Sequence, residues 1–578
     1  MSKRKPISVA VWDALVWLTI ILPVLTGGIW IHRPGLKVEL TQINAQVFVL
    51  SLIGFFVFSV LRFPLQETSS IRFLTFLWKT WKGLVENKGY KALLVGALLV
   101  AILFAAASIR RHLSFGSGAA DLGIFTNAIW NLTHANGYVS SVKDGINLFA
   151  DHQSPVFWLF APVFWLFPSP NTLLIVQALG LALGAIAVYV LAKQYLPSNP
   201  EFRAALPLIY WAYLPLRNAN AFDFHPEVFI LPAFLAAIAA IHSTKSSIRL
   251  LGVFFLILGL MGKESSGPLA VGLGIAWMLG ASPVSARSFS RIVGIVLVIA
   301  GATLFVFDTQ VVPKLAGAGA YAYDSHYADF GQGLTSLIFA PFSKTELFFS
   351  RVFGPARLTF MWATIAPLGF LPLVGWKPFI SSYVCYLMLF LGVGDHRIAP
   401  IYHYAIEPAV GLFWGLVLGI SVLISSQTLR LKWLTPKRLL LWLLFWSLVL
   451  FGRSEVFRIR YFSPTGHMKW LRAEVLPAVN EKVTVAASGA LVAHLATRKW
   501  VHHLPKIENP KIGMVDCVFY DSELNQWPLP SQEIPNFLDE INAKGYRQVY
   551  SCNSFKAFQN QRSQSECLMR SPVCPGLK

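Results

Sequence analysis

The sequence predicts an all-α bundle that crosses a membrane many times and ends in a small α/β domain. Three observations predict it. The chain is 55% hydrophobic and only 13% charged, its mean hydropathy is +0.56, and long apolar segments recur as far as about residue 452. Soluble domains carry about 25% charged residues, so the charged content is about half the ordinary value. Apolar runs this long and this numerous exceed what the buried helices of one soluble domain need.

The N-terminus combines a basic start, MSKRK, with an apolar stretch from Val9 to Ile31. A signal peptide begins in the same way, but this stretch is longer than a signal-peptide core and no convincing small-residue cleavage site follows it. We therefore expect an uncleaved first membrane span.

Thirteen candidate spans follow from the apolar segments. Several are shorter than the roughly 20 residues that a perpendicular helix needs, and short helices are tolerated beside a protein-lined cavity. We divide the chain into two additional N-terminal helices with a linker (1–90), a transmembrane core (91–452) with a large first outer loop (111–171), and the α/β domain (453–578). The expected spans are 9–31, 46–63, 91–110, 172–194, 204–219, 228–243, 250–262, 265–280, 292–308, 358–376, 378–394, 405–425 and 438–452.

The basic residues orient these spans. With the N-terminus in the cytoplasm, Lys and Arg are denser in the cytoplasmic loops than in the outer ones, as the positive-inside rule requires. The net charge of +20 could suggest a nucleic-acid partner, but the basic residues are dispersed, so we expect none. An odd number of spans places residues 453–578 outside the cytoplasm, and we expect a multi-pass protein of the cell (plasma or inner) membrane.

The tail changes in character. Strands are expected at 483–488, 500–504, 513–520 and 546–552, and helices at 489–498 and 535–544, which predicts a small α/β domain. An even number of cysteines outside the cytoplasm allows two disulfides, although free thiols fit the sequence as well. The four cysteines are Cys517, Cys552, Cys567 and Cys574. Their spacing matches no zinc site, and the sequence does not specify how they pair.

Polar motifs lie at the ends of the predicted spans, nearly all on the side away from the cytoplasm. An ionised side chain at the bilayer centre costs about 2.5–3.5 kcal/mol, so such residues belong at span ends or in a wet cavity. Separate polar clusters on one face indicate a shared site. Their members are Asp121; Asp151 and His152; Asp223, His225 and Glu227; Lys263 and Glu264; and Asp395, His396, His403, Tyr404 and Glu407.

The motifs of the first outer loop also have structural interpretations. Asp121 can cap a helix that the pattern predicts from Leu122 to His134, because Asp is a favoured N-cap residue. Asp151 and His152 shortly precede a proline, which fits a turn.

The later motifs have structural interpretations as well. Residues 223–227 can be a solvated loop, and Lys263 with Glu264 can be an ion pair between two apolar helices. His403 and Glu407 are four residues apart on one helix face, which suits either a hydrogen bond or a pair of ligands.

An aromatic segment without charges, SPVFWLFAPVFWLF, runs from Ser154 to Phe167. It is too short to span a bilayer comfortably, and its Trp and Phe content suits a helix in the outer membrane interface. A lipid-linked substrate would meet such a surface first.

Five motifs carry a resemblance to a known family. With them, residues 91–425 and more loosely the tail resemble an uncharacterised family of prokaryotic polytopic membrane proteins, a domain of unknown function. That family is similar to the GT-C class of membrane glycosyltransferases. Two positions depart from the family pattern: Ala120 replaces an aromatic residue, and Ser265 replaces an acid. The motifs are DLGIF from Asp121 with WNL from Trp130, Asp151-His152 with Ser154-Pro155, FDFHPE from Phe222, Lys263-Glu264, and His403-Tyr404.

This resemblance implies a GT-C-like core and an inverting transfer of sugar from a polyprenyl-phosphate-linked donor on the exoplasmic face. It implies that Asp121 is the general base, because a carboxylate is ionised at neutral pH and needs only correct placement. The leaving phosphate requires positive charge from Lys263 or His225, or a divalent metal such as Mg²⁺ or Mn²⁺. The metal ligands would be Asp151 with Asp223 or Glu227, and the substrate-binding residues Asp151, His152, Glu264, His403 and Tyr404.

Two other functions compete with this one. A transporter or flippase for a lipid-linked or anionic solute would use the same polar residues along a pathway, but such proteins usually show paired repeats, and the sequence has no convincing repeat. A non-catalytic assembly or sensor protein would concentrate its polar clusters in the tail rather than at span ends. The acceptor, the donor sugar and the lipid are not specified by the sequence.

Overall fold

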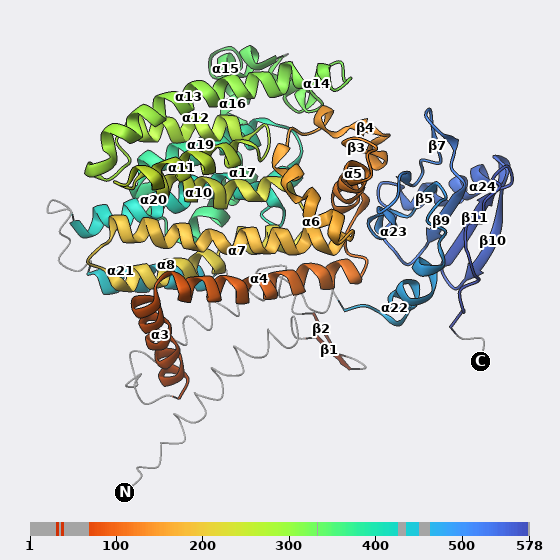
Figure 1. Ribbon diagram of the computed structural model, residues 1–578, viewed down its shortest axis with the longest axis horizontal. Helices are drawn as coiled ribbons and strands as arrows, with labels where there is room; N and C mark the ends of the chain where they lie inside the picture. The colour runs from red at the N-terminus through yellow and green to blue at the C-terminus, as the bar shows by residue number, and fades with distance from the viewer. Residues whose placement is uncertain are drawn as a thin grey trace, which may run out of the picture.

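The computed structural model describes residues 30–33, 36–39, 69–331, 333–425, 435–449 and 463–575. The predicted spans at 9–31 and 46–63 lie outside the described residues, apart from the start of β1 (Trp30–Arg33), which pairs antiparallel with β2 (Leu36–Glu39). From α3 (Ser69–Lys88) on, the chain forms a bundle of helices, and a smaller α/β unit lies at one end of it (Figure 1).

Four helical stretches of the described chain are long and apolar enough to cross a membrane. A helix lies at every predicted span from residue 91 on, but the predicted number of thirteen spans is not confirmed, because most of these helices are short. The long stretches are α4 (Tyr90–Leu113), α7 (Pro170–Tyr195), Val284–Leu315 with α13 (Arg287–Gln310) and α14 (Val312–Leu315), and His403–Ser425 with α20 (Ile406–Ser425). Shorter ones are α10 (Ile230–Ile241), α11 (Ser246–Leu260), α12 (Ser266–Met278), α19 (Trp376–Leu391) and α21 (Pro436–Val449).

Two predicted spans are broken. The span expected at 204–219 is divided at Tyr213 into α8 (Pro200–Ala212) and α9 (Leu214–Ala221), because Pro215 cannot continue the helix before it. The span expected at 358–376 is divided into α17 (Pro355–Ile365), a 3₁₀ turn and α18 (Leu371–Val374). Gly369 and Phe370 have positive φ angles of 62° and 60° at this break, which end helical geometry.

Small residues allow the helices to approach closely. A Cβ atom added to Gly267 of α12 would lie 2.7 Å from the carbonyl oxygen of Gly301 in α13, and one added to Gly274 would lie 2.5 Å from that of Gly294. Backbones in such contact gain van der Waals packing, which drives helix association where no hydrophobic effect acts between lipid and protein. These two glycine pairs therefore hold α12 against α13.

The first outer loop is built from short elements. A π-helical turn, η2 (Ala119–Gly123), leads into α5 (Ile124–Thr133), close to the helix predicted at 122–134. The strands β3 (Val139–Ser140) and β4 (Ile146–Asn147) form a small hairpin. The aromatic segment forms η5 (Pro155–Phe160) and α6 (Ala161–Leu166), and its Trp165 is 69% exposed, as expected for an interfacial helix. The loop ends where α7 begins.

The C-terminal unit is a five-stranded sheet in the order β10-β11-β9-β5-β6, in which β5 is parallel to β6 and β9, and β11 is antiparallel to β9 and β10. The sequence did not predict β11, although Asn553, with φ 50°, provides the tight turn that joins it to β10. The elements are β5 (Val485–Ala487), α23 (Gly489–Leu495), β6 (Val501–His503), β9 (Cys517–Asp521), α24 (Ile534–Ala543), β10 (Tyr546–Cys552) and β11 (Phe555–Asn560).

Two disulfides close this unit. Cys517 pairs with Cys567, and Cys552 pairs with Cys574, so the pairing that the sequence left open is now defined. Cys385, buried in α19, is a free thiol. The alternative of free thiols in the tail is therefore wrong.

The C-terminal unit packs against the first outer loop. Helix α23 lies on η2, and a Cβ atom added to Gly123 would lie 3.2 Å from Val492 Cγ1. The buried Asn127 side chain donates to the carbonyl oxygens of Ala496 (3.2 Å) and Arg498 (2.7 Å) and accepts from the backbone N–H of Ser141 (2.7 Å). The C-terminal unit thus packs against the turn that carries Asp121 and helps to hold it in place.

Candidate functional site

Asp121 contacts a histidine rather than capping a helix. Its side chain is 30% exposed, its carboxylate oxygen lies 3.1 Å from His225 Nε2, and neither η2 nor α5 has a side-chain cap. His225 Nδ1 lies 3.0 Å from the Asp223 carbonyl oxygen, which only accepts, so Nδ1 carries a proton and Nε2 is aimed at Asp121. Burial raises the pKa of Asp121, but the charge of His225 and its hydrogen bond outweigh it, and the net pKa is below the ordinary value.

Three proline-flanked or turn segments supply the centre of the site. His225 precedes η6 (Pro226–Phe229), and its ring stacks on that of His403 with centroids 3.6 Å apart. His403 begins η11 (His403–Ala405), and its Nε2 lies 2.9 Å from Glu227 Oε1. Lys263, in the turn between α11 and α12, donates to the same Glu227 oxygen at 3.0 Å. A continuous chain of contacts therefore connects Asp121 to Lys263.

Asp223 supports the loop rather than facing the centre. Its carboxylate pairs with Arg111, at the end of α4, and accepts from the backbone N–H of Gly118 at 2.9 Å. Arg111 also lies over the Phe222 ring, 5.0 Å from its centroid. Asp223 thus fixes the segment that precedes η2, and the predicted role as a metal ligand stays a prediction.

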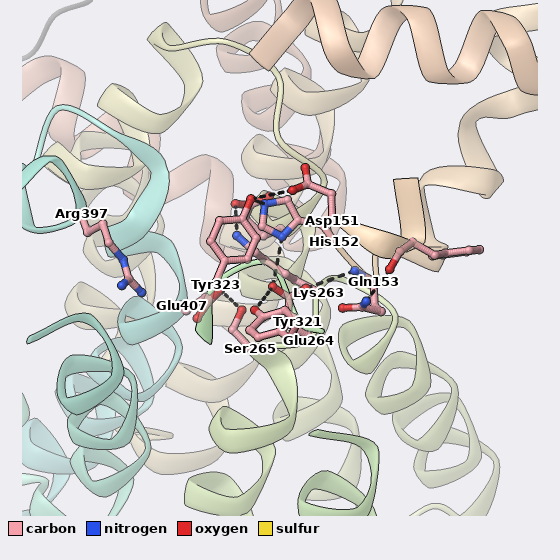
Figure 2. Close-up of polar contacts among 12 residues, drawn as sticks. Asp151, His152, Gln153, Lys263, Glu264, Ser265, Tyr321, Tyr323, Arg397 and Glu407 are labelled. Atoms are coloured by element: carbon pink, nitrogen blue, oxygen red, sulfur yellow. Dashed lines mark hydrogen bonds and ion pairs between the residues drawn. The ribbon is translucent and has the colours of Figure 1, made fainter. Parts of the chain in front are cut away.

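A second group of contacts lies beside Lys263 (Figure 2). His152 Nδ1 lies 3.1 Å from Glu264 Oε1, and the Gln153 backbone N–H donates to Glu264 Oε2 at 3.2 Å. Tyr321 donates to Glu264 Oε1 at 2.8 Å. The Tyr323 hydroxyl lies 3.0 Å from Asp151 Oδ1 and 2.9 Å from His152 Nε2. We call Asp151, His152, Glu264, Tyr321 and Tyr323 the tyrosine-capped cluster.

The neighbours of this cluster are also paired. Lys143 forms an ion pair with Asp151 at 3.1 Å, so the turn interpretation of Asp151 and His152 does not account for their contacts. Ser265 donates to Glu407 at 2.5 Å, which brings a carboxylate beside the position where the family pattern has an acid. The Tyr404 ring lies 4.2 Å from that of His403. His403 lies in the 3₁₀ turn before α20 and Glu407 in the first turn of α20, so they have different partners and do not form the pair predicted on one helix face.

One group among the described residues could hold a metal ion. His225, Glu227 and His403 are all buried, and one ligand atom of each lies within 4.8 Å of the others. His403 Nδ1 is buried without a hydrogen-bond partner among the described residues. Two imidazoles with one carboxylate suit Zn²⁺ better than Mg²⁺, which prefers oxygen ligands. Asp151 and Asp223 are not in this group, and the Lys263 ammonium already contacts Glu227.

Several contacting residues were not expected from the sequence. Tyr321 and Tyr323 lie in an Ala- and Gly-rich stretch, AGAGAYAYD, where two evenly spaced tyrosines were the available signal. Arg111 lies between Arg110 and His112 at the end of α4, and Lys143 is a basic residue of the loop that follows. Gln177, which accepts from the His225 backbone N–H at 3.0 Å, sits within an apolar helix, and a buried amide there is a usable signal.

The comparisons with known proteins agree with the motifs. The family described as predicted membrane protein, DUF2079, matches residues 111–555. This chain belongs to that family. The resemblance to an uncharacterised membrane protein family is thereby confirmed, and the apolar helices agree that the chain is a membrane protein. No curated protein matches the sequence.

Some solved structures are similar to the DUF2079 chain. ArnT from Cupriavidus metallidurans bound to undecaprenyl phosphate has a TM-score of 0.46 at 11% identity, over 81% of this chain and 98% of ArnT. The oligosaccharyltransferase of Archaeoglobus fulgidus in the apo form has a TM-score of 0.39 at 11% identity, over 81% of this chain and 75% of that chain. Its complex with Zn and sulfate has a TM-score of 0.39 at 12% identity, over 80% and 73%.

Proposed function

We propose that this DUF2079 protein is a membrane glycosyltransferase that moves a sugar from a polyprenyl-phosphate-linked donor to an acceptor hydroxyl on the exoplasmic face. One observation carries the proposal: a partly exposed carboxylate, Asp121, is oriented by His225 and connected through His403 and Glu227 to the buried cation Lys263. The exposed aromatic face of η5 and α6 belongs to the same outer loop and would meet the lipid.

The proposed step needs a base and a stabilised leaving group. Asp121 takes the proton of the acceptor hydroxyl while the hydroxyl oxygen attacks the anomeric carbon from the side opposite the phosphate, so the configuration inverts. The bond between the anomeric carbon and the phosphate oxygen breaks, and polyprenyl phosphate leaves with the negative charge. Lys263 is the proposed source of positive charge for that phosphate. His225 is a positioning residue for Asp121. A Zn²⁺ ion, if held by His225, Glu227 and His403, would add Lewis acidity there, in place of the contact between His225 Nε2 and Asp121.

The test measures donor consumption, because the acceptor is unknown. The protein is placed in nanodiscs made with polyprenyl-phosphate sugars and membrane extract, and released polyprenyl phosphate is followed by mass spectrometry. Loss of a positioned base lowers the rate about 10²–10⁴-fold, so we expect this loss in both Asp121→Asn and Asp121→Ala. Asp395→Asn is the matched control, because that carboxylate lies on the same side of the bundle and is 84% exposed.

The two Asp121 variants also separate catalysis from structure. Asn keeps the shape and polarity of the side chain but is not a base, whereas Ala removes both. Near-normal release of polyprenyl phosphate by Asp121→Asn would overturn the assignment. Movement of an intact lipid-linked sugar across the membrane of reconstituted vesicles, without release of polyprenyl phosphate, would instead indicate a flippase.

A further inference from the structure

The two tyrosines of the tyrosine-capped cluster belong to a segment whose last part is attached separately, because His326 accepts from the Val393 backbone N–H, Tyr327 donates to Met388, and Asp329 pairs with Arg351. We call residues 316–331, between α14 and α15 (Gly333–Ser343), the strap. Within this fully described segment Phe330 is the one buried residue, and the other side chains are exposed or half-buried. A segment with so little buried apolar surface is held mainly by its hydrogen bonds.

Both ends of the strap contain glycine in conformations that other residues rarely adopt. Gly317 has a φ of 88°, and a Cβ atom added to it would meet nothing within 4 Å; Gly319 also has open space around it. Gly331 has a φ of 115°. Glycine at such positions lets the backbone change direction without steric cost. Gly317 and Gly319 therefore form a pivot before the part of the strap that carries Tyr321 and Tyr323, whereas Gly331 follows the attached residues 326–330.

The hydroxyl groups of the strap fill the hydrogen-bonding capacity of buried acceptors. Glu264 and Asp151 are both buried, and each accepts a hydrogen bond from one strap tyrosine, Tyr321 and Tyr323 respectively. His152 still contacts Glu264 and Lys143 still contacts Asp151 when the strap leaves, but each carboxylate loses one donor, and the loss of a hydrogen bond to a buried acceptor favours a replacement donor. The Tyr323 ring also covers the His152 ring at 4.7 Å, with 9° between the planes.

The chemistry of these positions determines which kind of ligand can replace the tyrosine hydroxyls. Two carboxylates demand O–H or N–H donors and repel an anion such as a phosphate, and the flat face of His152 accepts an apolar surface. A pyranose offers several hydroxyl donors on one side and a C–H face on the other. The lipid phosphate of the donor fits this cluster poorly, and its sugar fits it well.

We propose that the Tyr321 and Tyr323 hydroxyls occupy the places of two sugar hydroxyls, and that the sugar displaces the strap when it binds to Asp151, His152 and Glu264. The identity of the ligand as a sugar rests on the proposed function. The displacement itself rests on the contacts and the glycine pivot. The strap then competes with the sugar. The apparent association constant of the sugar equals the intrinsic one multiplied by the fraction of time that the strap leaves the site open.

Hydrogen exchange of residues 316–331 tests this without turnover. The full-length protein in nanodiscs is titrated with decyl glucoside, decyl galactoside, decyl mannoside and decyl N-acetylglucosaminide, and with decyl phosphocholine as a phosphate-bearing probe without a sugar. We expect at least one glycoside to increase strap exchange saturably and decyl phosphocholine to have no effect. If none of the four glycosides changes the exchange, the proposal is overturned.

The variants decide whether the tyrosines compete with the sugar. Tyr321→Phe with Tyr323→Phe keeps both rings, and we expect faster strap exchange without ligand and an affinity for the effective glycoside at least about fivefold tighter. Tyr327→Phe is the control, because the Tyr327 hydroxyl, also in the strap, donates to the Met388 carbonyl oxygen at 3.0 Å instead. Weaker or unchanged glycoside affinity in the double variant would show that the tyrosines bind the sugar or only support the fold.

The same titration in Asp121→Asn separates this inference from the proposed function. Asp121 contacts His225 and not the strap, so glycoside-driven strap release should persist in that variant. Strap release without any Asp121-dependent release of polyprenyl phosphate would leave a sugar site in a protein that is no glycosyltransferase. Asp121-dependent turnover without strap release would remove only the inference drawn here.

Discussion

The His225 and His403 imidazoles stack face to face with their ring centroids 3.6 Å apart. His225 follows α9 and contacts Asp121, whereas His403 precedes α20 and contacts Glu227. The stack is therefore the junction between the proposed base on one side and the Glu227–Lys263 ion pair on the other. Substitution of either histidine would separate these two halves.

The same junction predicts a competition between Lys263 and a metal ion. Glu227 is shared by His403 and Lys263, so Zn²⁺ at His225, Glu227 and His403 must displace the ammonium group. We expect Lys263→Met to bind Zn²⁺ at least about tenfold more tightly, which corresponds to about 1.4 kcal/mol of removed competition. Titration against a chromogenic chelator measures it. Lys143→Met, whose lysine pairs with Asp151 outside this group, is the control, and equal affinity in Lys263→Met and the unmodified protein would refute the competition.

The disulfides predict a definite number of reactive thiols. The chain has five cysteines, of which Cys385 alone is free in the structure. Denatured, unreduced protein should therefore take up one maleimide and reduced protein five, as read by mass. Because disulfides persist in oxidising compartments, this result also supports an exoplasmic C-terminal unit. Five reactive thiols without reductant in protein isolated under thiol-blocking conditions would contradict both statements.

The orientation has its own measurement. A reporter that is active only in the cytoplasm, fused after Lys578, should stay silent if the C-terminal unit is exoplasmic. The cytoplasmic loops, by contrast, should give an active fusion, for example between α7 and α8. A strong signal from the Lys578 fusion would reverse the predicted topology and place the whole candidate site on the cytoplasmic side.

Asn127 should couple the C-terminal unit to the turn that bears Asp121. Its amide is buried, bonds to Ala496, Arg498 and Ser141, and cannot be replaced by an apolar side chain without leaving unsatisfied groups. We expect Asn127→Leu to lower the free energy of unfolding of this unit by about 1–3 kcal/mol. Faster hydrogen exchange in both α23 and η2 would show this loss of stability. Asn542→Leu, on the exposed face of α24, is the control and should leave both unchanged.

The strap should respond to pH in a defined window. Burial raises the pKa of Glu264, but the nearby charges of His152 and Lys263 and the hydrogen bonds from His152 and Tyr321 lower it below 4.5 on balance. Burial and Glu264 raise the pKa of Tyr321 well above 10.0. A carboxyl with a lowered pKa contributes stability that is complete above 4.5 and lost as the pH falls through the folded pKa. A phenol with a raised pKa contributes stability that is complete below pH 10.0 and is lost as the pH rises through the folded pKa. The other ionisable groups near Glu264 are Asp308, Tyr323 and Glu407.

Hydrogen exchange of the strap, corrected for the intrinsic pH dependence of amide exchange, measures this response to pH. We expect constant protection between about pH 5 and pH 9, and a loss of protection on acidification below about pH 4.5. Glu264→Gln should abolish the acid-induced change at Tyr321. Protection that begins to fall near pH 7 would indicate that another group controls the strap.

The sequence by itself determined the class of the protein and most of its local structure. Apolar length and composition act within one segment, so a helix lies at every span predicted from residue 91 on, although two of these spans are broken and the helices at 333–352 were not predicted, and the alternating tail forms a sheet with two helices. The motif residues that the sequence assigns to one face of the membrane also proved to be connected: Asp121, His225, Glu227, Lys263 and His403 form one chain of contacts. Charge at span ends is a local signal, because the bilayer excludes it from the centre.

Only the tertiary structure decided which of these residues are partners. It showed that Asp121 contacts His225 and does not cap a helix, that Asp223 pairs with Arg111, and that Tyr321 and Tyr323 contact Glu264 and His152. It also paired Cys517 with Cys567 and seated α23 on η2. These contacts join segments far apart in the chain. Their geometry depends on how helices broken at Tyr213 and Gly369 pack against each other, which no local pattern of residues specifies.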